Sequence, residues 1–141
     1  MVGVVATASL GALAGTTATA DTEHQSTWGK TYDRWNDPDD EGGQSISEAA
    51  TKHATGEYVS ASFQAYGEIL QINDRHDNDR PAIAKLWVGG SGPAIYYGNG
   101  DDTSRELNLS YAEGERVYLQ VCTSDSPNAI CTDKEKYVGN T

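Results

Sequence analysis

Side chains that could do chemistry are present in this sequence, but their spacing does not form a catalytic motif. A serine nucleophile needs a sharp turn and a base within reach, and Gly90-Ser91-Gly92 meets this requirement only superficially. The three histidines, His24, His53 and His76, stand in polar contexts and form no H-E-x-x-H zinc pattern. With 21 acidic residues, a carboxylate pair for glycoside hydrolysis is always available, so its presence carries no information. We therefore predict a protein that is not an enzyme and uses no cofactor.

One acidic loop raises the question of calcium, which takes six to eight oxygen ligands, often from loops. Such oxygens are offered by Asp74, Asp77, Asn78 and Asp79. The glycine and the distal glutamate of an EF-hand are in the wrong places. Asp and Asn also form ordinary loops, because they hydrogen-bond their own backbone and tolerate turn geometry. We predict no metal site, and calcium binding by residues 74–79 stays an open alternative.

Exposed aromatic rings near amide groups are typical of glycan-binding modules. Trp87, Tyr96 and Tyr97 stand near Asn99 at two adjoining predicted loops. They are the candidate residues for binding a glycan. The alternative is ordinary sheet packing, since Trp and Tyr are favoured in strands.

A second aromatic group lies in residues 21–44, a polar segment with few aliphatic residues that cannot build its own core. Trp28, Tyr32 and Trp35 are spaced by four and three residues, which would place the rings on one face of a short helix. We predict an N-terminal arm that docks on a protein partner through these three residues. The alternative is that the rings fold back and cap the core of the domain.

The first 20 residues predict export. Residues 1–20 contain no charged side chain and end in Ala18-Thr19-Ala20, which is typical of a signal peptide and its cleavage site. The basic beginning of such a peptide is missing, which places the true start upstream of Met1. The net charge of −11 argues against binding nucleic acid and against anionic membrane surfaces. In a secreted protein, Cys122 and Cys131 are expected to form a disulfide, worth roughly 2–3 kcal/mol.

The remaining pattern predicts a β domain over residues 45–141. A capping box at Ser45-Ile46-Ser47-Glu48 predicts a short helix that ends at Gly56. Short alternating runs then follow, and two of them, 66–73 and 82–88, flank a polar loop as an antiparallel hairpin would. Strands are predicted over 58–64, 66–73, 82–88, 94–97, 103–109 and 116–122, with an edge strand over 131–138. We expect a small antiparallel β-sandwich of six to seven strands with a short N-terminal helix and an extended N-terminal arm.

Three runs carry a resemblance to a known family. They are Phe63-x-Ala65-Tyr66-Gly67-Glu68-x-Leu70-x-Ile72-x-Asp74, Ala82-x-Ala84-x-Leu86, and Glu113-Gly114-x-x-Val117-x-x-x-Val121-Cys122. With the alanine-rich leader, they resemble small secreted proteins of Streptomyces-type bacteria, and most of all the adaptor subunit of the umbrella toxin particles, which are antibacterial assemblies. The resemblance implies a non-enzymatic link between a lectin-bearing subunit and a large toxin subunit, with an N-terminal extension in a partner groove. Two alternatives stay open: a glycan-binding module, and a secreted protease inhibitor that presents the arm or the disulfide loop.

Overall fold

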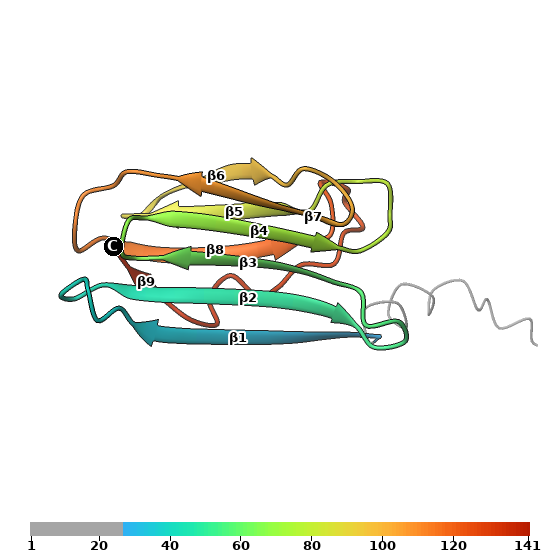
Figure 1. The fold of residues 1–141 in the computed structure, drawn as a ribbon, viewed down its shortest axis with the longest axis horizontal. Helices are drawn as coiled ribbons and strands as arrows, with labels where there is room; N and C mark the ends of the chain where they lie inside the picture. Colours follow the sequence, from blue (N-terminus) through green and yellow to red (C-terminus); the bar gives the residue numbers. More distant parts are fainter. Residues whose placement is uncertain (1–26) are drawn as a thin grey trace, which may run out of the picture.

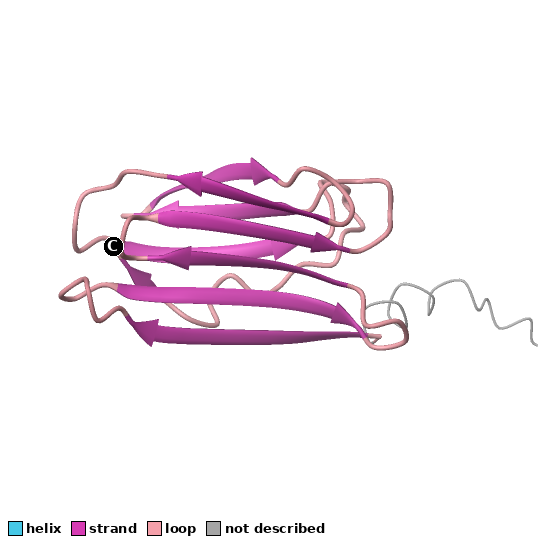
Figure 2. Cartoon of the chain, viewed as in Figure 1, coloured by secondary structure: helices cyan, strands magenta, loops and turns pink. Residues whose placement is uncertain are grey.

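The computed structural model describes residues 27–141, so the predictions for the signal peptide and for His24 lie outside the described residues. The described part is built from nine strands and contains no helix (Figure 2). The strands are β1 (Trp28–Asn36), β2 (Gln44–Lys52), β3 (Tyr58–Gln64), β4 (Ile69–Arg75), β5 (Ile83–Val88), β6 (Ser91–Tyr97), β7 (Thr103–Asn108), β8 (Arg116–Cys122) and β9 (Gly139–Asn140). The all-β class is confirmed, with more strands than predicted. None of these residues lies in a helix long and apolar enough to cross a membrane.

All pairings are antiparallel, and the strands follow the order β6-β5-β8-β9-β2-β3-β4-β7, with β1 on the other edge of β2. The short strand β9 joins the two halves, because Asn140 pairs with both Gln44 of β2 and Arg116 of β8. The sheet turns at this point and curls into a half-barrel. One wall is β1-β2-β3-β4-β7 and the other is β6-β5-β8 (Figure 1).

The core fills the space between the two walls. The alternation predicted for β4, β5 and β8 is confirmed, since every second residue of these strands points inward and is buried. The largest fully buried apolar side chains are Phe63, Ile46, Leu70, Ile72, Leu86, Leu119, Val59, Val117 and Val121. The two walls therefore share one hydrophobic core.

The predicted hairpin between β4 and β5 is wrong. β4 pairs with β3 and β7, whereas β5 pairs with β6 and β8, so the loop between them crosses from one wall to the other. Asp74, which is only 1% exposed, lies at the end of β4, just before this loop. Its carboxylate accepts the N–H of His76 at 3.1 Å and of Ala82 at 2.7 Å. The two apolar runs therefore lie in different walls, and their buried residues belong to one core.

The predicted helix that begins at Ser45 is also wrong, because these residues form β2. Ser45 does not cap a helix, and its hydroxyl accepts the N–H of Ala65 at 2.9 Å. Ile46 and Ala50 are fully buried on the inner face, in the two-residue period of a strand. Helix propensity differs by only a few tenths of a kcal/mol per residue among such side chains. β2 gains more from hydrogen bonds to β1 on one edge and β3 on the other.

The predicted arm contains β1, which pairs with β2 in continuous register from Trp28↔Lys52 to Asn36↔Gln44. The helical spacing inferred for the three aromatic residues is therefore wrong. No strand forms over 131–138, where only an isolated bridge joins Cys131 to Cys122. The predicted disulfide between these two cysteines is confirmed. It is weakly consistent with an extracellular protein.

Candidate functional site

β1 is an edge strand of the sheet formed by residues 27–141. Just beyond its ends, Thr27 O accepts the N–H of His53 and Asp37 N donates to Gly43 O. Because hydrogen-bonded pairs alternate in an antiparallel ladder, the odd-numbered residues of β1 bond to β2 and the even-numbered ones face the opposite edge. No strand within residues 27–141 pairs with that edge. An unpaired edge nine residues long is a template for a further strand.

The strand separates the three predicted partner-binding residues. Trp28 is 5% exposed and packs in the core, where its ring meets the ring of His76 edge-on at 4.9 Å. Tyr32 shares its face and is half-buried, whereas Trp35 lies on the opposite, outer face and is 38% exposed. Trp28 therefore packs in the core, as in the alternative in which the rings fold back onto the domain. Trp35 is the most exposed of the three rings.

Tyr32 ties β1 to the segment that follows the disulfide. Its hydroxyl accepts the N–H of Asp133 at 2.8 Å, and Lys30 Nζ lies 3.4 Å from the carboxylate of Asp133. The ring of Tyr137 meets that of Tyr32 edge-on at 6.4 Å, and Arg34 stands 5.6 Å above Tyr137. Burial is the main cause that raises the pKa of Tyr32 to about 12. The inner face of β1 is thus already occupied by this chain.

Glu48 is a buried carboxyl directly opposite Tyr32 in the ladder. It is 2% exposed, and Thr132 Oγ1 donates to its Oε2, while its Oε1 has no hydrogen-bond partner among residues 27–141. Thr132 Oγ1 also accepts the N–H of Val121 at 2.9 Å. Burial is the main cause that raises the pKa of Glu48 to about 8, and the nearby charge of Asp133 adds to it. Glu48 therefore holds a proton at neutral pH.

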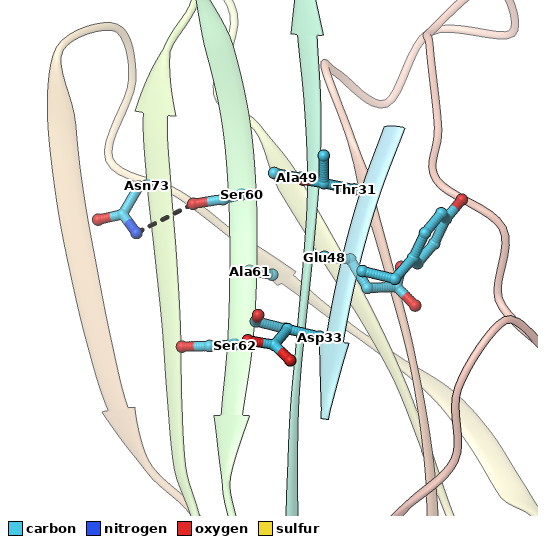
Figure 3. Close-up of a pocket in the computed structure, with 10 residues that line it drawn as sticks. Thr31, Asp33, Glu48, Ala49, Ser60, Ala61, Ser62 and Asn73 are labelled. Atoms are coloured by element: carbon cyan, nitrogen blue, oxygen red, sulfur yellow. Dashed lines mark hydrogen bonds between the residues drawn. The ribbon is translucent and has the colours of Figure 1, made fainter. Parts of the chain in front are cut away.

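A shallow trough of about 410 Å³ lies on the outer face of β1, β2, β3 and β4 (Figure 3). Ser47 lies opposite Asp33 on one side and Ser62 on the other, so the three side chains form one row across the sheet. The next row joins Ala49 to Thr31 and Ser60, and Ser60 pairs onward with Asn73. The residues at the centre of the two rows, Ser47 and Ala49, have small side chains, and this leaves the space of the trough. Polar groups line most of it.

The predicted glycan-binding residues do not form one surface. In β5 and β6, Ile83 lies opposite Tyr97 and Ala84 opposite Tyr96, so the two tyrosines point to opposite faces. Tyr97 is 43% exposed, whereas Tyr96 packs against the core and its hydroxyl lies 3.4 Å from that of Tyr111. Trp87 shares the outer face with Tyr97, and Lys134 Nζ stands 4.3 Å above its ring.

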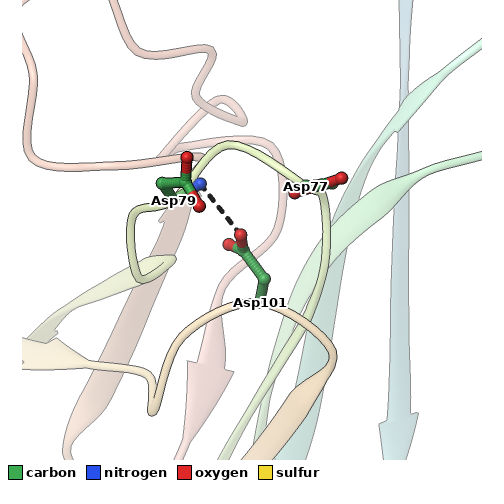
Figure 4. Close-up of side chains that lie close together, drawn as sticks. All are labelled: Asp77, Asp79 and Asp101. Atoms are coloured by element: carbon green, nitrogen blue, oxygen red, sulfur yellow. Dashed lines mark hydrogen bonds between the residues drawn. The ribbon is translucent and has the colours of Figure 1, made fainter.

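The acidic loop gathers a different set of oxygens from the one predicted. Asp77, Asp79 and Asp101 bring carboxylate oxygens within 4.8 Å of one another (Figure 4). Asp79 N donates to Asp101 Oδ2 at 2.8 Å. Asp74 points inward, where both of its oxygens accept backbone N–H groups. Exposed acidic groups commonly gather without an ion, so this cluster alone assigns no metal.

No protein-family model, no curated protein and no solved structure matched this chain. The family is therefore not shown by comparison. The resemblance to the umbrella toxin adaptor stays a prediction.

Two features escaped prediction from the sequence. Glu48 was interpreted as part of a capping box, and it also breaks the apolar series of Ile46 and Ala50 on the inner face of β2, so the strand gave no clear alternation. The trough is assembled from residues far apart in the sequence. Serines at alternate positions, Ser45 and Ser47 in β2 and Ser60 and Ser62 in β3, were the only local sign of a polar sheet face.

Proposed function

We propose that this protein is a secreted, non-enzymatic adaptor that docks on another protein through β1, within an extracellular antibacterial toxin assembly. The observation that carries the proposal is the outer edge of β1, with which no strand of residues 27–141 pairs. Edge strands of this kind recognise partners by adding a strand, where backbone hydrogen bonds supply affinity and side chains supply specificity. The toxin assembly as the setting rests only on the sequence resemblance.

β1 is suited to this role because its own position is fixed before binding. The ladder to β2 holds one edge, and the contacts of Lys30 and Tyr32 with Asp133 hold the inner face. A partner strand would therefore meet a rigid template, which lowers the entropy lost on binding. Trp35, exposed near the end of the strand, supplies a large ring beside the free edge.

The test compares two substitutions at one edge position. Lys30→Pro removes an outward N–H and the ion pair with Asp133, whereas Lys30→Ala removes only the side-chain interaction. Tagged protein is used to capture partners from the culture supernatant of the producing organism, and thermal denaturation verifies that each variant is folded. We expect stoichiometric capture by the wild type and by Lys30→Ala, and loss of capture by Lys30→Pro.

Two results would contradict the proposal. A wild-type protein that remains a partnerless monomer would exclude an adaptor role. Capture that survives in a folded Lys30→Pro protein would show that the partner binds elsewhere.

A further inference from the structure

The trough on the outer face of the β1-β2-β3-β4 wall offers free hydrogen-bonding groups. Within residues 27–141, the hydroxyls of Thr31, Ser47 and Ser62 make no hydrogen bond to the rest of the chain. The amide of Asn73 is held in one orientation, because its Nδ2 donates to Ser60 Oγ at 3.1 Å and its Oδ1 accepts from Ser104 Oγ at 2.7 Å. The trough thus combines adaptable hydroxyls with a fixed amide.

Two exposed aromatic rings belong to the same face and flank the trough. In β1, Trp35 follows Asp33 by two residues, and in β3, Tyr58 precedes Ser60 by two residues. They are 38% and 37% exposed. The register places them six residues apart along β2, opposite Ser45 and Thr51, which is about 20 Å at the rise of a strand. That length suits a short oligosaccharide better than a single sugar.

The charge of this face limits the ligand. Within residues 27–141, Asp33 is the only carboxylic acid that lines the trough from the outer face of the sheet, and no lysine or arginine of this part lines it. The chain as a whole carries −11, so a polyanion would be repelled. A peptide is also a poor match, because peptide grooves rely on apolar pockets for alternate side chains, whereas between the two flanking rings the outer face is lined by Ala49 and otherwise by polar side chains. A neutral ligand rich in hydroxyl groups matches the lining.

We propose that this trough binds a neutral oligosaccharide, with sugar hydroxyls bonded to the row of Asp33, Ser47 and Ser62 and to Asn73. Sugar rings stack on Trp35 and Tyr58 at the two ends. This site lies on the opposite wall from Trp87 and Tyr97, the residues that the sequence suggested for a glycan. It shares β1 with the docking edge through Asp33 and Trp35, but Tyr58 and Ser62 lie on β3 in the interior of the sheet, so these two residues belong to the trough alone.

The test is calorimetric titration of the protein with two neutral hexasaccharides, cellohexaose and N-acetylchitohexaose, and with hexagalacturonate as the anionic comparator. Tyr58→Ala and Tyr97→Ala form a matched pair, since both remove an exposed tyrosine from the outer face of a wall. Ser62→Tyr fills the trough, and Ser62→Ala removes one hydroxyl without adding bulk. Thermal denaturation verifies the fold of every variant.

We expect saturable binding of at least one neutral hexasaccharide and none of hexagalacturonate. Tyr58→Ala should weaken that binding roughly three- to tenfold, the usual worth of one aromatic contact, and Tyr97→Ala should leave it unchanged. Ser62→Tyr should abolish binding; if that variant fails to fold, a weakening in Ser62→Ala takes its place. The proposal is overturned if neither neutral hexasaccharide binds, if binding survives both Tyr58→Ala and a folded Ser62 variant unchanged, or if Tyr97→Ala alone reduces it.

Discussion

Glu48 should make the stability of this protein fall as the pH rises, and replacing it with glutamine should remove that dependence. Its pKa is raised from 4.5 to about 8, chiefly by burial. Between these values the unfolded chain releases the proton while the native chain keeps it, so the free energy of unfolding decreases with pH. At 1.36 kcal/mol per pKa unit, the full loss is about 5 kcal/mol, reached above about pH 8. Below about pH 4.5 both states are protonated and the effect vanishes.

The assay is equilibrium urea denaturation at intervals between about pH 5 and pH 9, on the wild type, Glu48→Gln and Glu106→Gln. Glu106 is an exposed carboxylate on β7 and serves as the matched control. We expect the wild type to lose several kcal/mol relative to Glu48→Gln across this range, and Glu106→Gln to follow the wild type. The glutamine amide lowers the free energy of unfolding by about 1–3 kcal/mol at every pH if one of its groups stays unpaired. The test is therefore how steeply the free energy of unfolding falls with pH in each protein, not its absolute value. Parallel curves for the wild type and Glu48→Gln would refute the reasoning.

Three further predictions concern stability, each measured by urea denaturation. The double substitution Cys122→Ala, Cys131→Ala should lower the free energy of unfolding by about 2–3 kcal/mol through the lost loop constraint; an unchanged value would contradict this. Trp28→Ala should cost about 3–5 kcal/mol because the ring is buried, whereas Trp35→Ala should stay within about 0.5 kcal/mol; equal losses would mean that the two rings are equally packed. Asp74→Ala should cost about 2 kcal/mol or more, since two backbone N–H groups lose their acceptor, and Asp74→Asn should recover part of it. Equal losses in these two Asp74 variants would argue against the hydrogen bonds.

Local alternation was sufficient to predict much of the β structure. The bounds predicted for Tyr58–Gln64 and Arg116–Cys122 coincide with β3 and β8. In both strands every second residue is apolar and buried, so the period alone determines which face is inward. The disulfide was predictable for a similar reason, because two cysteines allow only one intramolecular pair.

Pairing partners were not predictable in this way, because they depend on contacts distant in sequence. The polar loop between β4 and β5 is long enough either for a hairpin or for a crossing between the walls. Asp74 stabilises the crossing through hydrogen bonds that its buried carboxylate accepts, and its burial cannot be read from the local sequence. Glu48 is similar. The residue that donates a hydrogen bond to its carboxyl group, Thr132, is 84 residues away, and no local pattern reveals that a carboxyl will be protonated in the interior. The helix signal in the same residues was therefore stronger than the strand signal.

β1 explains why the aromatic residues pointed to binding and yet misled about geometry. In a helix, residues 28–36 would present the three rings on one face. In the strand that they form, the rings are divided between two faces. Its inner face binds the chain's own Asp133 and Tyr137 segment, its outer face borders the trough, and its edge is unpaired. The two proposals can be tested separately, because Lys30→Pro changes the edge and the inner face of β1 at a residue that does not line the trough, whereas Ser62→Tyr changes the trough and leaves the edge intact. Trp35 stands where the edge and the trough meet, so Trp35→Ala should weaken both protein capture and saccharide binding if both proposals hold.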